Sequence, residues 1–225
     1  MQTINVYSSS YIANTANVKA ALETYATDYF SSVTISDNIV KCYVDGVLWL
    51  TITVPSSGSS ATFACVGKTQ NCTFRGGYSA TMYVSEIQIF DNAIVFVLSY
   101  NDVPYYPSSF VLTKNKAGVV TLLAANASYS SNYVNVGYGY VNSDKTNSFA
   151  AMSVGNDVAV YNVYRQYIIG GNVFGVPIFT SDSSTVNVLQ SVVSAFSDQS
   201  VPHQIIVDGE SWYSIVYDSI YIKST

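Results

Sequence analysis

The sequence has few charged residues. Of its 225 residues, 9 are Lys or Arg and 14 are Asp or Glu, so that 10% are charged, whereas roughly 25% is usual in soluble proteins. Hydrophobic residues make up 49% of the chain, and this share excludes disorder of the charge-rich kind. So few charged side chains cannot cover the whole exterior of the protein. We therefore expect much of the surface to be covered by other chains.

Basic residues and long apolar runs are scarce as well. The net charge is −5 and the only arginines are Arg75 and Arg165, which argues against nucleic-acid binding because phosphates require a basic face. The longest apolar runs, such as 93–98 and 119–125, are far shorter than the roughly 18 residues of a membrane-spanning helix. The first residues contain no basic stretch followed by an apolar one, so we expect neither a secretory signal nor a membrane span.

The chain has three cysteines and one histidine. An odd number of cysteines without a signal peptide does not indicate a disulfide framework, so reduced thiols are expected. The alternative is that Cys65 and Cys72 bridge a hairpin. A zinc site needs about four ligands at a recognisable spacing, and one histidine does not supply such a pattern. We predict that the protein holds no metal and no cofactor.

The sequence contains no complete catalytic motif. Residues 67–69 (Gly-Lys-Thr) end like a phosphate-binding loop, but Thr62 stands where that motif needs its first glycine. Residues 77–81 begin like the nucleophile elbow of a hydrolase and lack its final glycine. His203 is the only candidate imidazole base, and most aspartates lie at turn-like positions. We predict that the chain is not an enzyme.

The predicted fold is mainly β, a hairpin-rich sandwich or barrel-like structure with an N-terminal helix. Apolar residues at steps of three and four predict the helix at 15–31. The strand-like runs 39–44 and 47–54 follow it, joined by Asp45 and Gly46. Because Asp-Gly tolerates the positive φ of a tight hairpin turn, this pair predicts a hairpin.

Further strands are predicted where apolar residues alternate with polar ones or where β-branched residues cluster. The segment 184–197 has apolar residues at steps of three, four and three, which favours a second, shorter helix. The remaining predicted strands are 61–66, 82–90, 94–100, 110–113, 119–123, 158–163 and 173–179, with short strands and loops in 128–147 and a final hairpin in 205–222.

Two prolines, Pro104 and Pro107, interrupt the strand pattern near the middle of the chain. Proline cannot donate to a sheet ladder, so a boundary between two domains is predicted there. The helix and first hairpins occupy 1–103, and a second β-rich domain occupies 104–225. A single domain is the alternative.

The two Asp-Gly turns share the pattern Val-Asp-Gly-x-x-Trp at 44–49 and 207–212. The flanking sequences do not align, which favours two uses of the same hairpin chemistry over a duplicated unit. Each tryptophan lies three residues beyond its turn, and we predict that both indoles are largely buried. The predicted structural residues of the hairpins are Asp45, Gly46, Trp49, Asp208, Gly209 and Trp212.

Tyrosine is unusually frequent, with 20 residues. It combines a large apolar area with a hydroxyl, which suits interfaces and sugar-binding platforms. The alternative is that these residues belong to a tyrosine-rich strand packed within a sheet. The densest group is the candidate interaction surface Tyr129, Tyr133, Tyr138 and Tyr140.

Five segments after Met82 carry a further pattern: strand-like runs, a turn, an aromatic pair and a short final strand. They are residues 92–97, 110–114, 118–120, 206–213 and 220–223. In this order the chain resembles virion structural proteins of tailed bacteriophages, especially those of phages and prophages of gut bacteria. The resemblance does not extend to the first 80 residues.

The resemblance implies a head decoration or fibre, neck or tail component that is made in the host cytoplasm without a signal peptide and is located in the virion. Its partners would be copies of itself and other virion proteins. One alternative is a carbohydrate-binding or receptor-binding module similar to an adhesin, which would bind a host-surface glycan. Another is a glycan-degrading enzyme.

Overall fold

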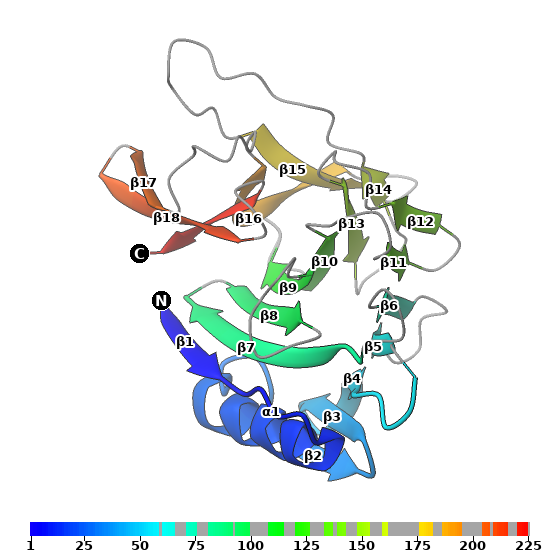
Figure 1. Ribbon diagram of the computed structural model, residues 1–225. Helices are drawn as coiled ribbons and strands as arrows, with labels where there is room; N and C mark the ends of the chain where they lie inside the picture. Colours follow the sequence, from blue (N-terminus) through cyan, green and yellow to red (C-terminus); the bar gives the residue numbers. More distant parts are fainter. Residues whose placement is uncertain are drawn as a thin grey trace.

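The computed structural model describes residues 1–58, 60–65, 71–75, 81–91, 93–99, 108–114, 120–126, 133–136, 139–142, 148–153, 159–161, 176–181, 186–194, 204–207, 209–215 and 220–224. In these ranges the chain forms one helix and 19 strands in three antiparallel sheets. The fold is mainly β with an N-terminal helix, which confirms the predicted class (Figure 1).

The first sheet has seven strands and holds the N-terminal strand at one edge. Its order is β1 (Gln2–Asn5), β7 (Tyr83–Phe90), β8 (Ala93–Ser99), β9 (Ser108–Lys114), β10 (Val120–Asn126), β13 (Ser148–Ser153) and β14 (Ala159–Tyr161).

The second sheet also has seven strands and contains the first Asp-Gly hairpin. Its order is β12 (Gly139–Asn142), β11 (Tyr133–Val136), β6 (Asn71–Arg75), β5 (Ser60–Cys65), β4 (Val47–Thr53), β3 (Ile39–Val44) and β2 (Ser32–Ser36).

The third sheet has five strands and contains the C-terminal hairpin. Its order is β15 (Val176–Ser181), β16 (Val186–Ser194), β19 (Ile220–Ser224), β18 (Glu210–Ile215) and β17 (Gln204–Val207).

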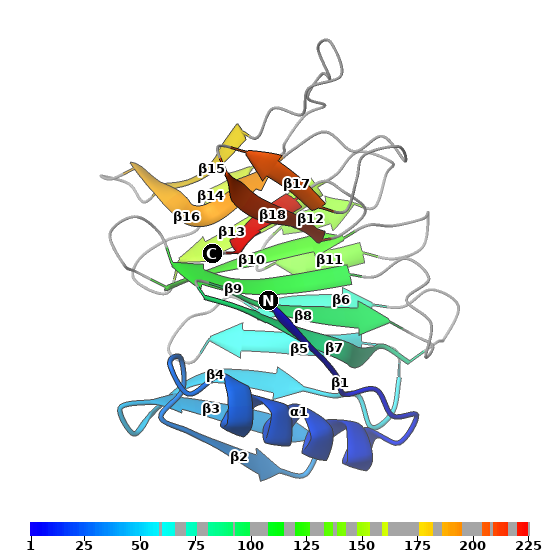
Figure 2. The same ribbon diagram turned by 90° about the vertical axis from the view of Figure 1, so that its left-hand side faces the viewer.

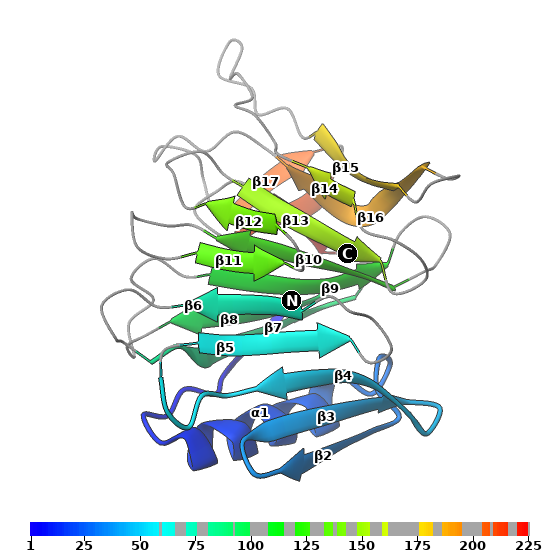
Figure 3. The ribbon, with the colours of Figure 1, turned by 90° about the vertical axis from the view of Figure 1, so that its right-hand side faces the viewer.

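The two seven-stranded sheets pack face to face around an aromatic core (Figure 3). Phe63 of the second sheet stacks on Phe110 of the first with ring centroids 4.1 Å apart. Its edge-on neighbours are Phe96 at 5.3 Å and Phe74 at 5.7 Å. All four side chains are fully buried. Aromatic pairs contribute beyond the area that they bury, so this cluster joins the two sheets into a sandwich.

Helix α1 (Tyr11–Tyr25) covers one end of this sandwich, where it contacts β2 and β3 of the second sheet and β7 of the first (Figure 2). Its buried positions recur at steps of three and four and include two polar residues, Asn14 and Thr15. The Asn14 amide donates to the backbone oxygens of Val6 at 2.9 Å and Val84 at 2.7 Å. These bonds fix the N-terminal segment to β7.

The helix begins and ends earlier than the predicted range 15–31. Ser10, in an extended conformation, precedes its first residue, and the chain leaves the helix at Ala26. A turn follows, in which the N–H groups of Tyr29 and Phe30 both donate to the Ala26 oxygen at 3.0 Å. Through this turn, Tyr29 and Phe30 pack in the core. Because they follow Leu22 by seven and eight residues, they fit the helical periodicity in the sequence although they lie beyond the end of the helix.

The predicted second helix at 184–197 is wrong, because residues 186–194 form strand β16. Apolar residues at 186, 188 and 192 also fit the period of two, and β-branched valine favours strands. The segment pairs antiparallel with β15 and β19, and this pairing makes it a strand rather than a helix. Strands β1, β2, β6 and β13 were not predicted.

Both Asp-Gly hairpins are confirmed as hairpins. Strands β3 and β4 pair around Asp45 and Gly46, whose φ angles are 50° and 76°, with Val44 opposite Val47. Strands β17 and β18 pair with Val207 opposite Glu210, and Gly209 has a φ of 81°. The segment predicted as a final hairpin, 205–222, contains a third strand, because β19 follows β18 and pairs with it.

The first sheet continues across the predicted domain boundary at 103/104. Strands β8 and β9, which lie on either side of it, are antiparallel neighbours, with Phe96 opposite Phe110. Strand β6 likewise pairs with β11 in the second sheet. Residues from both predicted domains thus share both seven-stranded sheets, and this arrangement favours the single-domain alternative.

Candidate functional site

The β3–β4 hairpin ends in a tip that a neighbouring loop holds in place. The Gly46 N–H donates to Oγ of Ser31 at 3.4 Å, and the Ser31 hydroxyl donates to the Tyr43 oxygen at 3.1 Å. The Ser31 N–H donates to the same oxygen at 2.8 Å. Val47, the first residue after the turn, is 68% exposed. The tip therefore presents an apolar side chain on a backbone that is fixed on one side.

The two tryptophans are both of intermediate burial, neither fully buried nor exposed. Trp49 packs against the core cluster, with its ring centroid 6.0 Å from that of Phe30. Trp212 lies opposite Lys223 in the ladder between β18 and β19, and Lys223 forms an ion pair with Glu210. Within the described residues, Nε1 of Trp212 is buried and has no hydrogen-bond acceptor.

Among the described residues, Cys42 and Tyr29 have shifted pKa values, and both are unsuited to nucleophilic chemistry. Burial raises the pKa of the Cys42 thiol from 9.0 to about 12, so this thiol is protonated at neutral pH and is a poor nucleophile. Burial also raises the pKa of Tyr29, and the charges of Asp28 and Asp91 raise it further. Neither side chain is activated for catalysis.

The register does not place Cys65 and Cys72 opposite each other. Cys72 of β6 pairs with Phe63 of β5, two positions before Cys65. Diagonal neighbours of this kind have Cα atoms about 7–8 Å apart, whereas disulfides join Cα atoms at about 4.4–6.8 Å. The β5–β6 register therefore does not favour the disulfide alternative.

Among the described residues, no group of three His, Cys, Asp or Glu side chains is placed to hold a metal ion. In the same part of the chain, no helix is long and apolar enough to cross a membrane. His203 and Asp208 lie outside the described residues. The absence of catalysis, metal and cofactor stays a prediction.

Two of the four predicted surface tyrosines are placed on neighbouring strands. Tyr133 of β11 pairs with Asn142 of β12, and Tyr140 of β12 pairs with Asn135 of β11. The other two, Tyr129 and Tyr138, lie outside the described residues. Strand β12 is an edge of the second sheet, so half of the proposed surface lies in the ladder nearest to a sheet edge.

The distribution of charge between inner and edge strands was not predicted. In the described sheets, none of the six edge strands contains Asp, Glu, Lys or Arg. Inner strands contain six such residues, namely Lys41, Arg75, Glu86, Lys114, Glu210 and Lys223. No sequence signal could reveal this pattern, because only the pairing order shows which strands are edges.

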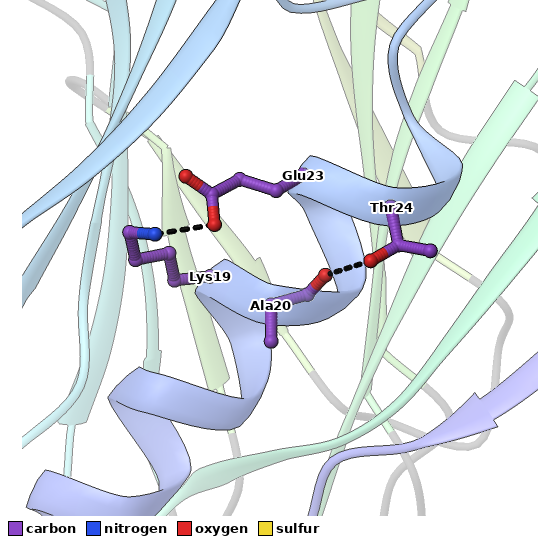
Figure 4. A network of polar contacts seen from close by, with 4 residues as sticks. All are labelled: Lys19, Ala20, Glu23 and Thr24. Carbon is purple, nitrogen blue, oxygen red and sulfur yellow. Dashed lines mark hydrogen bonds and ion pairs between the residues drawn. The ribbon is translucent and has the colours of Figure 1, made fainter.

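The helix differs from the edge strands because it carries charge on its surface. Lys19 and Glu23 form an ion pair one turn apart (Figure 4). Next to it, the Thr24 hydroxyl donates to the Ala20 oxygen at 2.8 Å. Pairs of this kind stabilise a helix slightly and keep its surface solvated. The edge strands of the described sheets, in contrast, contain no charged side chain beside their unpaired backbone groups.

Comparison with models of known protein families, with curated proteins and with solved structures yields no match.

Proposed function

We propose that the chain is a non-catalytic structural protein of a tailed-bacteriophage virion and that it works as a repeated subunit. It contacts copies of itself and other virion proteins. The observation that carries the proposal is the absence of charge from all six edge strands of the described sheets. Edge strands expose unpaired N–H and C=O groups, and monomeric proteins usually protect them with lysine, proline or inward-pointing charges. Of the six described edge strands, only β15 contains a proline, Pro177.

The composition supports the same role. With 10% charged residues and 20 tyrosines, the surface is suited to contact with other proteins, since interface cores lose charge and gain aromatic side chains. The raised pKa of Cys42 is consistent with a structural thiol. A protein that acts through repeated contacts requires no catalytic group, no metal and no cofactor.

The proposal is tested by the presence of the chain in particles. Phage particles purified from the source culture should contain it in many copies, measured by quantitative mass spectrometry against the major capsid protein. The free chain should also gain mass in light scattering as its concentration rises. A chain absent from the particles would contradict the virion assignment. Binding of the chain to a glycan array would favour the carbohydrate-binding alternative.

A further inference from the structure

Strand β2 is the outermost strand of the second sheet, at the end of the molecule that carries α1 (Figure 3). Among the described strands it pairs with β3 alone, from Ser32 opposite Tyr43 to Ser36 opposite Ile39. Its other side presents backbone N–H and C=O groups as a template for a further strand. Four of its five residues are exposed, and only Val33 is buried.

The sequence of β2 lacks the features that block strand pairing. Ser-Val-Thr-Ile-Ser contains no charged residue and no proline, and the three central residues are β-branched, which favours extended structure. The one register shift nearby falls between β3 and β4 and leaves the β2–β3 ladder regular. The edge is therefore uninterrupted over all five residues.

The order of residues in β2 is nearly the same in both directions. If two copies of the strand pair antiparallel about Thr34, serine faces serine, threonine faces threonine, and Val33 faces Ile35. Cross-strand pairs of β-branched residues and of threonines are favourable. Such an arrangement has two-fold symmetry, the commonest symmetry of protein dimers.

One apolar side chain of β2 is left uncovered on the face that points toward the core. Val33 and Ile35 lie on this face, beside the fully buried Cys42 and Val40 of β3. Val33 is 3% exposed, whereas Ile35 is 38% exposed. In the two-fold pairing, Val33 of the second copy is the residue directly opposite Ile35, on the same face of the joined sheets.

The charges near β2 are compatible with a second copy. Asp37, just beyond the strand, lies opposite Ser31 of the other copy in this register, so the two carboxylates do not face each other. Lys41 is the nearest basic residue and pairs with Thr34. The two copies of Lys41 would be separated by three strand spacings, about 14 Å, which exceeds the screening length of about 8 Å at physiological salt.

We propose that the β2 edge is a self-association site: two copies of this chain join their second sheets by antiparallel β2–β2 pairing centred on Thr34. This contact deepens the homotypic association in the proposed function and rests on it. Five residues on each side are fewer than the about 20–30 of a stable interface. The dimer therefore dissociates on dilution and forms where many copies are held together.

Disulfide trapping tests the register. Thr34→Cys places two thiols at the symmetry axis, with Cα atoms about 4.5–5.5 Å apart, a distance that a disulfide spans. Mild oxidation should therefore convert this variant to a covalent dimer. Mixed Ser32→Cys and Ser36→Cys chains should form a heterodimer faster than either variant forms a homodimer. Thr3→Cys, on the exposed edge strand β1 of the first sheet, is the matched control.

A charge substitution tests the energetics. Thr34→Lys places two ammonium groups opposite each other in the dimer but leaves the monomer with one exposed side chain. Sedimentation over about a hundredfold range of concentration should show its association constant lowered by about tenfold or more. Thr3→Lys, the same change on β1, should associate like the unmodified chain.

These experiments distinguish a failure of the β2 contact from a failure of the proposed function. If the unmodified chain self-associates but Thr34→Lys associates equally well, or Thr34→Cys forms disulfides no faster than Thr3→Cys, the β2 contact is refuted and homotypic assembly uses another surface. If the unmodified chain stays monomeric throughout, both the β2 contact and the homotypic part of the proposed function fail. Trapping and charge sensitivity together support the β2 contact whether or not the chain is found in particles.

Discussion

The two Asp-Gly hairpins have the same short sequence pattern and lie in different surroundings. In β3–β4, the strands are inner members of the second sheet, and Leu50 and Ile52 are fully buried. In β17–β18, the first strand is a sheet edge, and Ile206 is 71% exposed. The comparison shows that a local pattern can specify a turn without specifying how deeply its strands are buried.

The largest expected effect is a loss of stability in the β3–β4 hairpin, whose side chains are packed in the core. Leu50→Ala on β4 should reduce the free energy of unfolding by about 2–5 kcal/mol, because it removes a buried side chain and leaves a cavity. The measurement is urea unfolding followed by circular dichroism. A loss below about 1 kcal/mol would mean that the β3–β4 hairpin is not part of the cooperative core.

The glycines of the two turns should instead behave alike. Gly46 and Gly209 have φ angles of 76° and 81°, and a Cβ atom at either position would meet no other atom within 4 Å. Gly46→Ala and Gly209→Ala should therefore each cost about 1–2 kcal/mol from backbone strain alone. Urea unfolding of both variants checks this. If Gly209→Ala has no effect while Gly46→Ala does, the third sheet unfolds separately from the sandwich.

Alkaline pH should affect the β3–β4 hairpin through Cys42. Its pKa is raised from 9.0 to about 12 in the folded state, so the unfolded state loses its proton first. The resulting stability is fully present below about pH 9 and is lost as the pH rises toward 12, with a slope of at most about 1.4 kcal/mol per pH unit. Cys42→Ala should show a shallower decline between pH 9 and 10. Equal slopes for the variant and the parent would contradict the burial of this thiol.

The smallest expected effect belongs to the edge strand β17. Ile206→Ala should change the free energy of unfolding by less than about 0.5 kcal/mol, because an exposed side chain loses little contact. The same urea titration measures it, with Ile52→Ala on β4 as the buried counterpart. A loss comparable to that of Ile52→Ala would show that another part of the molecule covers β17.

The helix and strands were predictable to different degrees. The N-terminal helix was predicted, but its bounds were wrong, because Tyr29 and Phe30 reach the core through a turn that imitates helical spacing. The segment at 186–194 fits both helical and strand periods, and only its neighbours β15 and β19 make it a strand. The candidate interface at β2 could not be predicted, since its edge position depends on the order of strands.

The sequence by itself determined the β-rich class, the two Asp-Gly turns and the low surface charge, because these depend on composition and on conformational preferences within a few residues. Only the tertiary structure decided which strands lie at sheet edges, and hence that no edge strand of the described sheets is charged. It also decided that Val33 is buried while Ile35, two residues along the same strand, is left uncovered. Strand order and burial depend on contacts between residues far apart in the chain, and local sequence does not fix those contacts.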